Sequence, residues 1–291
     1  MSEAASMIKF SRRAAMAGAI ALAGCQRGPK APAAAPPKTI AAAVAGSWRS
    51  AADKARDRWR HPAESLAFWG LEAGDTVVEF WPGAGWYSEI LAPFLDATGG
   101  KLFAAHLQLA EPVDPAAAQV VEAYRARFAA GRKPYGVVEV TAFGPTSGPV
   151  APAGSADLVL FLRNLHNWMA AGIAEKAFRD AFLALKPGGA LGVEEHRAAP
   201  GGVPDLLADS GYVDQAYAIK LGQEAGFRLA AASEINANPK DTRDHPFGVW
   251  TLPPVRRSSP RGEAFDPKFD RARYDAIGES DRMTLKFVKP A

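Results

Sequence analysis

The stretch VVEFWPGAGWYSEIL, from Val77 to Leu91, constrains the fold more than any other part of the sequence. Its first residues form an apolar run, which is typical of a parallel strand buried on both faces. Gly83 and Gly85 follow within a tight turn, and helical spacing begins at Trp86. A strand, a glycine turn and a helix in this order predict the first unit of a sheet with helical crossovers.

The same alternation of strands and helices continues to the end of the chain. Because parallel strands need crossover connections, this order predicts an α/β fold with a doubly wound, mostly parallel sheet and right-handed crossovers. Strands are predicted at 76–81, 101–106, 136–141, 157–162, 190–195, 227–235 and 282–288, and helices at 62–69, 86–95, 115–130, 170–185 and 214–225.

Residues 236–280 interrupt this pattern. A segment of this length without regular periodicity is either a functional lid or a partly disordered excursion. The apolar residues between 247 and 252 are able to pack, so we expect order in the first half of the segment, through Pro254.

The first 25 residues read as an export signal. A charged start with Lys9, Arg12 and Arg13 precedes a short, mildly apolar run ending at Ala23, which is too short to span a bilayer. The arginine pair resembles the twin-arginine signal that exports folded bacterial proteins. The sequence Leu-Ala-Gly-Cys that ends in Cys25 resembles the bacterial lipobox and implies a lipid anchor on that cysteine. The alternative is a chance cysteine in an alanine-rich leader.

Cys25 is the one cysteine of the chain, so no disulfide forms within it. Residues 26–46 are rich in alanine and proline and predict an extended tether, and residues 47–291 predict one domain. The net charge of +3 is too small to indicate nucleic-acid binding, and no second long apolar segment indicates a membrane span. The partners expected are a small-molecule substrate and the membrane, through the lipid on Cys25.

The glycine turn is the first candidate for a ligand site. In an open α/β sheet, ligands bind beyond the carboxyl ends of the strands, where the strand order reverses. Gly83 and Gly85 let the backbone approach a ligand and tolerate positive φ, and the amides that open the next helix form a partly positive end. Pro82 stiffens the start of the turn by fixing one φ angle.

Further segments accompany the turn sequence EFWPGAGWY: FLRNLHNW at 161–168, LKPGG at 185–189, DHPFGVWTLPP at 244–254 and DRMTLKF at 281–287. Together they resemble the class I S-adenosylmethionine-dependent methyltransferases, and more closely a branch of predicted methyltransferases found as exported bacterial proteins. The resemblance runs from about Asp53 to the end of the chain. It implies a Rossmann-like methyltransferase fold with a seven-stranded sheet whose last strand is antiparallel. It also implies S-adenosylmethionine as cofactor.

The resemblance assigns residues to this cofactor. Glu79, in the first strand, would help to position its methionine part, with Gly83, Gly85 and Tyr87 in the turn beneath it. Phe143 falls where the family contacts the adenine, although burial in the core is the more common reason for such a phenylalanine.

Two positions depart from the family pattern. Trp81 replaces its first glycine, and the indole either points into the core or fills the space of the cofactor. His106 stands where the family usually carries an acid that accepts hydrogen bonds from both ribose hydroxyls. A neutral histidine accepts one such bond, a loss of roughly 1 kcal/mol. Glu111 lies near as a substitute, and the alternative is loss of the cofactor.

Candidate catalytic residues follow the fourth predicted strand, in the loop RNLHNW from Arg163 to Trp168. Loops at this edge of a sheet often carry function. Asn164 and His166 are candidates to position a substrate nucleophile, with His166 as its general base. The alternative for His166 is to cap the helix that follows.

The fifth predicted strand ends in Glu194, Glu195 and His196. Strand alternation places Glu194 and His196 on one face and Glu195 on the other. A carboxylate and an imidazole on one face form an acid/base pair, two metal ligands or a solvated strand end. The five histidines are scattered, and neither an HExxH motif nor a cysteine cluster is present, so we predict no metal site.

Taken together, these features predict a methyltransferase-like lipoprotein that uses S-adenosylmethionine on a small-molecule substrate. We expect it in the periplasm, anchored to the envelope, with Gln26 after Cys25 favouring the outer membrane. The compartment favours the alternative, a periplasmic ligand-binding or interaction protein on a methyltransferase scaffold that has lost the cofactor, because S-adenosylmethionine is made in the cytoplasm. The space above Gly83 and Gly85 distinguishes the two: it is open in the first and filled by a tryptophan in the second.

Overall fold

The computed structural model describes residues 35–129, 131–202 and 204–291. The predicted export signal at 1–25, with Cys25, lies outside these residues, and so does the predicted tether up to residue 34. The chain from Ala35 onward forms one unit. Within this unit, no helix combines the length and the apolar character needed to cross a membrane.

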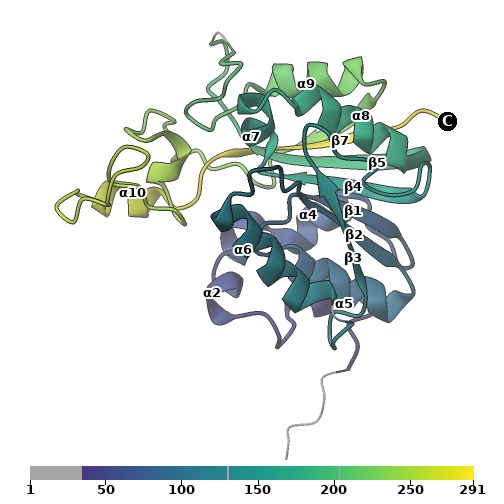
Figure 1. Ribbon diagram of the computed structural model, residues 1–291. Coiled ribbons are helices and arrows are strands. Elements are labelled where there is room, and N and C mark those ends of the chain that lie inside the picture. Colours follow the sequence, from purple (N-terminus) through teal and green to yellow (C-terminus); the bar gives the residue numbers. More distant parts are fainter. Residues whose placement is uncertain (1–34, 130, 203) are drawn as a thin grey trace, which may run out of the picture. The chain divides into compact units, whose positions relative to one another are not determined.

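One sheet of seven strands organises the described residues, in the order β3-β2-β1-β4-β5-β7-β6 (Figure 1). Neighbouring strands among β1 to β5 are parallel to each other, and β7 is antiparallel to both β5 and β6. The predicted doubly wound α/β sheet with an antiparallel last strand is therefore confirmed. The strands are β1 (Thr76–Phe80), β2 (Lys101–Leu107), β3 (Val138–Phe143), β4 (Ala156–Leu162), β5 (Leu185–His196), β6 (Arg228–Ser233) and β7 (Arg282–Val288).

Helices cover both faces of this sheet. In Figure 1, α8 and α9 lie on one side, and α4, α5 and α6 lie on the other. The α-helices are α1 (Ile40–Val44), α2 (Ala51–Lys54), α3 (Asp57–Arg60), α4 (Pro62–Trp69), α5 (Ser88–Thr98), α6 (Pro115–Tyr124), α7 (Leu165–Ala170), α8 (Ala174–Ala184), α9 (Gln215–Glu224) and α10 (Ala272–Ile277). A π-helical turn, η1 (Arg125–Ala129), continues α6, and a 3-10 turn, η2 (Gly248–Thr251), precedes α10.

Each face of the sheet has its own core. Phe80, Phe161 and Trp168 belong to the core on the side of α7 and α8, and all three are fully buried. Trp69 and Leu91 belong to the core on the side of α4 and α5. Burial on both faces explains why the strands read as near-continuous apolar runs.

The folded unit begins earlier than predicted, because α1 lies inside the predicted tether at 26–46. The Thr39 side chain accepts a hydrogen bond from Ala42 N at 3.1 Å and so caps the first turn. Ala43 is fully buried in the core beside α5. Alanine has the highest helix propensity, so a stretch that cannot build a core of its own still forms a helix against one.

Two further boundaries differ from the prediction. RNLHNW is not a loop, since α7 begins at Leu165 and buries Trp168 and Met169 among other residues. β5 begins at Leu185 rather than at 190 because LKPGG keeps pairing beyond a register shift, with Gly188 N donating to Lys289 O at 2.9 Å.

The segment at 236–280 is described in full, and it projects from the unit at α10 (Figure 1). Asp241 and Asp281 hold its base. Asp241 accepts hydrogen bonds from Tyr212 Oη at 3.0 Å and from Asp281 N at 2.8 Å. The Asp281 carboxylate lies 2.8 Å from Arg197 Nε and 2.6 Å from Arg243 Nη2.

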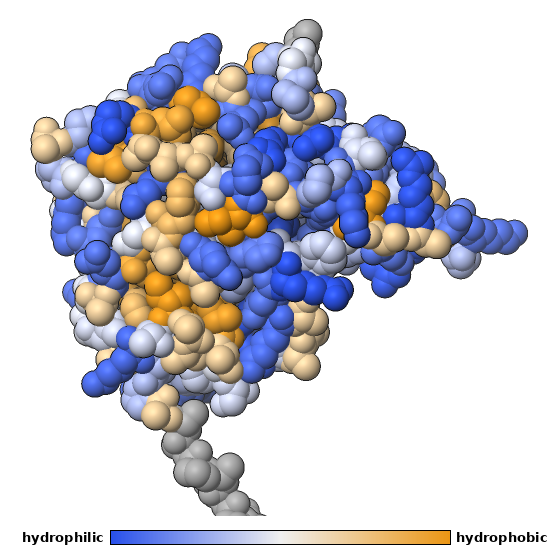
Figure 2. All heavy atoms as spheres, turned by 180° about the vertical axis from the view of Figure 1, so that it is seen from behind, coloured by the Kyte–Doolittle hydropathy of each residue, from blue (hydrophilic) through white to orange (hydrophobic). Residues whose placement is uncertain are grey.

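Apolar and hydrophilic residues share the surface. On the face shown in Figure 2, apolar residues gather in separate patches among hydrophilic side chains. Exposed apolar residues are normal on protein surfaces, so these patches need no partner to explain them.

Candidate ligand site

The two glycines of the turn after β1 have different surroundings. Gly83 has a φ of +59°, and a Cβ placed on it would meet nothing within 4 Å. Gly85 has a φ of +88°, and its Cβ would lie 2.3 Å from the Phe128 ring. Gly85 is therefore required by packing against η1, whereas space is open in front of Gly83.

The question whether a tryptophan fills that space is answered for Trp81 and Trp86, because neither lies within 4 Å of a Cβ placed on Gly83. Trp81 has a φ of +45°, and its Nε1 donates to Phe143 O at 2.9 Å. Its indole packs on the buried rings of Phe143 and Trp168, so it points onto the core. Trp86 donates to Asp53 O at 3.2 Å, toward the amino-terminal helices. Phe143 is fully buried, in line with its reading as a core residue.

Glu79 is held inside the molecule by neutral partners. Ser88 Oγ donates to Glu79 Oε2 at 2.6 Å, and Tyr124 Oη donates to Ser88 Oγ at 2.9 Å. Burial raises the pKa of Glu79 to about 7, although Ser88 and, at longer range, Arg163 favour the ionised form.

His106 uses both of its ring nitrogens on the backbone. Leu107 N donates to His106 Nδ1 at 2.8 Å, so the proton is on Nε2, which donates to Gly83 O at 3.1 Å. Burial lowers the pKa of this imidazole, which favours the neutral form. In this arrangement His106 has no lone pair left for a ribose hydroxyl.

The residues described do not fit S-adenosylmethionine in the manner of its family. His106 is satisfied by the backbone, the proposed substitute Glu111 is exposed, and Tyr87 is buried with its hydroxyl donating to Glu194 Oε2 at 3.2 Å. We therefore derive no reaction step through that cofactor.

A cavity of about 240 Å³ lies beyond the carboxyl ends of β4 and β5. We call it the arginine pocket. Val249, Trp250 and residues 252–255 form an apolar wall of it. Its charged and imidazole side chains are Arg60, Arg163, His166, His196, Glu279 and Arg282.

Two buried carboxylates hold the arginines of this pocket. Arg60 Nε and Arg282 Nη1 both donate to Glu279 Oε2 at 2.9 Å. Arg163 Nη1 donates to Glu194 Oε1 at 3.1 Å, and Arg282 Nε lies 2.8 Å from the same oxygen. The lining itself carries three guanidinium groups and one carboxylate, which favours an anionic ligand.

Of the two predicted catalytic residues, His166 lines the pocket and Asn164 does not. Asn164 Nδ2 donates to Trp81 O at 3.0 Å and to Leu162 O at 3.2 Å, which ties the start of α7 to the glycine turn. His166 lies inside α7 rather than capping it, and its Nδ1 lies 2.9 Å from Glu195 Oε1. Because an ionised carboxylate only accepts, Nδ1 carries the proton and Nε2 presents a lone pair.

At the end of β5, the carboxylate that lies near the imidazoles is not the one that strand alternation predicted. Glu194 was expected beside His196, but it is engaged by Arg163, Arg282 and Tyr87. The carboxylate near the imidazoles is that of Glu195, and the rings of His166 and His196 are 5.4 Å apart. Glu195 pairs with His166 because of where α7 lies, and the alternation of residues along a strand gives no information about that helix. Burial and, to a smaller extent, His166 and two arginines hold the pKa of His196 well below its ordinary value.

Sequence reasoning missed Arg60, Glu279 and Arg282 as parts of the site. A signal was present for the last two, because Glu279 stands just before the buried strand β7 and Arg282 is its first residue. Arg60 has no such signal, since its partner Glu279 lies 219 residues away.

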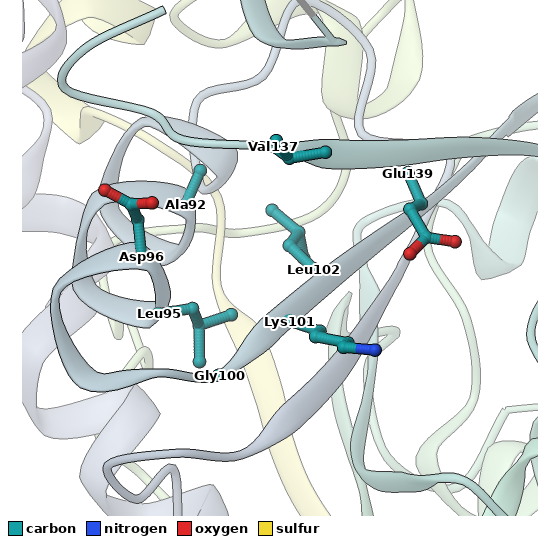
Figure 3. A pocket seen from close by; sticks show the side chains of 8 residues that line it. All are labelled: Ala92, Leu95, Asp96, Gly100, Lys101, Leu102, Val137 and Glu139. Atoms are coloured by element: carbon teal, nitrogen blue, oxygen red, sulfur yellow. The ribbon is translucent and has the colours of Figure 1, made fainter. Parts of the chain in front are cut away.

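Another cavity, of about 310 Å³, lies between α5, β2 and β3 (Figure 3). Lys101 is the first residue of β2, and Val137 comes directly before β3. This cavity is therefore at the amino ends of the strands, opposite the edge where ligands bind in open α/β sheets.

Comparisons with solved structures support the fold. The chain is similar to a methyltransferase candidate solved with the Trm112 methyltransferase activator of Haloferax volcanii, at 18% identity and a TM-score of 0.50, over 87% of this chain and 97% of that one. It is also similar to an S-adenosylmethionine-dependent methyltransferase from Aquifex aeolicus, at 19% identity and a TM-score of 0.49, over 62% of this chain and 87% of that one.

A third similar structure is the [4+2]-cyclase SpnF, at 17% identity and a TM-score of 0.48, over 84% of this chain and 83% of that one. No protein-family model matches the sequence. No curated protein matches it either. The seven-stranded sheet with β7 antiparallel to β5 and β6, together with the likeness to the structure solved with Trm112, shows a methyltransferase-like Rossmann fold.

Proposed function

We propose that this protein binds a small anionic molecule in the arginine pocket, on a methyltransferase fold that does not hold S-adenosylmethionine in the usual way. The ligand class is a small molecule that carries a phosphate or carboxylate group. The observation that carries the proposal is the lining of the pocket, in which Arg60, Arg163 and Arg282 converge from three parts of the chain.

The position of the pocket supports this proposal. In open α/β sheets ligands bind beyond the carboxyl ends of the strands, and the pocket lies there, next to the reversal of strand order between β1 and β4. Guanidinium groups match phosphate and carboxylate oxygens with paired N–H donors. Within the described residues, Arg163 gives one side-chain hydrogen bond, to Glu194, which leaves further donors for a ligand.

A second candidate is methyl transfer from S-adenosylmethionine to that same small molecule. One observation favours it: the turn at Gly83 keeps positive φ and open space, as a turn that passes beneath a ligand requires. Against it stand the two backbone hydrogen bonds of His106.

The proposal includes the location of the protein. The lipobox ending in Cys25 and the arginine pair before it support export to the periplasm and a lipid anchor in the envelope, with the outer membrane favoured. A periplasmic location agrees with a site that does not depend on a cofactor made in the cytoplasm.

Titration calorimetry of the purified full chain tests both candidates. Inorganic phosphate, S-adenosylmethionine and S-adenosylhomocysteine are titrated separately, up to millimolar concentration. We expect heat with phosphate and a loss of affinity of at least about tenfold in Arg163→Met, because a charge-assisted hydrogen bond is removed. Arg125→Met is the matched control, since Arg125 forms an exposed pair with Glu122 on α6.

Each outcome decides between the candidates. Phosphate heat that persists in Arg163→Met places the anion elsewhere and contradicts the proposal. Micromolar binding of S-adenosylmethionine contradicts the loss of the cofactor and favours methyl transfer. No heat with any of the three probes, from a chain shown to be folded, contradicts both.

A further inference from the structure

His166, Glu195 and His196 form a cluster beside the arginine pocket, whose lining includes the two histidines. His166 comes from α7, and the other two residues end β5. Each residue offers one ligand atom, and the three atoms lie within 4.8 Å of one another. This cluster was not apparent from the sequence, because strand alternation alone separates Glu195 from His196.

Short hydrogen bonds fix the carboxylate of the cluster. His166 Nδ1 lies 2.9 Å from Glu195 Oε1, and His196 N donates to the same oxygen at 2.8 Å. His166 N donates to Glu195 Oε2 at 3.3 Å. The Glu195 side chain is fully buried, so its position is set before any ligand arrives.

Glu195 differs from the other buried acids of the pocket in its charged partners. Glu194 contacts Arg163 and Arg282, and Glu279 contacts Arg60 and Arg282. Among the described residues, the one ion-pair partner within 4.0 Å of Glu195 is His166. A buried carboxylate needs a compensating positive charge, and an imidazole supplies one only when protonated.

We propose that His166, Glu195 and His196 bind a divalent transition-metal ion, with Zn²⁺ as the probe. Two imidazole nitrogens and one carboxylate oxygen are the protein ligands of many zinc sites that keep a position open for a further ligand. Nitrogen donors favour first-row transition ions over Mg²⁺ and Ca²⁺, which prefer oxygen.

The neighbouring arginines repel such an ion less than unpaired charges would, because Glu194 and Glu279 offset part of their positive charge. An ion at the cluster would lie beside the cavity that these guanidinium groups line. The open coordination position of the ion would then take one oxygen atom of the anionic ligand. This role rests on the proposed function, whereas binding of the metal itself does not.

The experiment is metal titration of the full chain after treatment with EDTA, in the absence of any anionic ligand. Zn²⁺ binding is followed by calorimetry, and Co²⁺ binding by its visible absorption bands. We expect one ion per chain, at micromolar affinity or tighter. His166→Ala, His196→Ala and Glu195→Gln each weaken binding by about 10- to 100-fold or more, as loss of a ligand or of a group that orients one does.

His61→Asn is the matched control. It removes an imidazole outside the pocket lining, and asparagine tolerates the positive φ of 38° at this position. Its affinity for Zn²⁺ stays at that of the unchanged protein.

Two results overturn the proposal: a folded chain that binds neither ion, or binding that the three cluster variants leave unchanged. Near-isosteric Glu195→Gln keeps the test valid where an alanine variant fails to fold. Failure of the anion titration together with success here rejects the proposed function and keeps the metal site, and the reverse rejects the metal site alone.

Discussion

Three buried carboxylates near the carboxyl edge of the sheet differ in the partners that hold them. Glu194 has two arginines, Glu195 has a histidine and backbone amides, and Glu79 has the hydroxyl of Ser88. Burial costs each of them solvation, and only a charge or several hydrogen bonds offset that cost. Glu79 is the least compensated, which is why its pKa rises to about 7.

The raised pKa of Glu79 predicts a dependence of stability on pH. The pKa rises from its ordinary value of 4.5 to about 7, so the folded state binds the proton more tightly than the unfolded state does. The contribution to stability is complete below pH 4.5 and is lost as the pH rises to about 7, a total on the order of 3 kcal/mol.

We therefore expect Glu79→Gln to gain stability relative to the unchanged protein at pH 8 but not at pH 4.5. Urea unfolding at the two pH values measures the difference. Glu122→Gln, on an exposed part of α6, is the control and shows no such difference between the two pH values. An equal effect of Glu79→Gln at both pH values would show that Glu79 ionises normally.

Residue types were readable from the sequence, but their partners were not. The doubt about a ribose contact at His106 follows from its chemistry alone, since a neutral imidazole has one acceptor. That this acceptor is spent on Leu107 N depends on the rotamer of the side chain and on the course of the backbone. Nothing in a linear sequence specifies either.

At the scale of elements, one aspartate joins the excursion at 236–280 to the sheet. Asp281 stands directly before β7 and accepts hydrogen bonds from Arg197, Arg243 and Asn238 N. Burial alone would raise the pKa of Asp281, but these three donors outweigh it and lower the pKa. The carboxylate therefore stabilises the attached excursion as long as it is ionised.

We expect Asp281→Asn to destabilise the protein by about 3 kcal/mol, because it removes a buried carboxylate that pairs with two half-buried guanidinium groups and leaves Arg243 without this charge partner. Limited proteolysis locates the effect, with faster cleavage within 236–280. Asp275→Asn, which breaks a more exposed pair with Arg256, costs about 1 kcal/mol or less. Equal cleavage rates in the two variants would contradict this role of Asp281.

Helices and strands that are long and have a clear apolar pattern were predicted best from the sequence. β7 was predicted at its observed bounds, because apolar residues at Met283, Leu285 and Phe287 alternate with polar ones and give a clear strand signal. α7 was missed because six residues, three of them with hydrogen-bonding side chains, are too few to show helical periodicity. Since α7 carries His166, missing this short helix also meant that the proposed metal-binding cluster was not predicted from the sequence.

At the scale of the whole molecule, the arginine pocket joins distant parts of the chain. Arg60 comes from α3 and Glu279 from the end of the excursion, 219 residues apart. A sequence pattern reports on neighbours along a helix or strand, and such a contact has no pattern of that kind. The edge of the sheet that carries the site was predictable, and the set of residues that meet there was not.

The proposed anchor is tested on the whole protein. We expect Cys25→Ala to abolish incorporation of labelled fatty acid and to move the protein from the membrane fraction to the soluble fraction, because the chain has no other cysteine. Ser6→Ala, in the same leader, leaves both properties unchanged. Membrane association of Cys25→Ala equal to that of the unchanged protein would reject the lipid anchor.

The place of β7 in the sheet also sets an order of events during synthesis. β7 is the last of the seven strands in chain order, yet it lies between β5 and β6 rather than at an edge of the sheet. Until it emerges, β6 has no neighbour to pair with, and Met283, Leu285 and Phe287 are missing from the core. A nascent chain that still lacks residues 282–288 therefore presents an unfinished sheet to chaperones, and folding before export requires that β7 has been made.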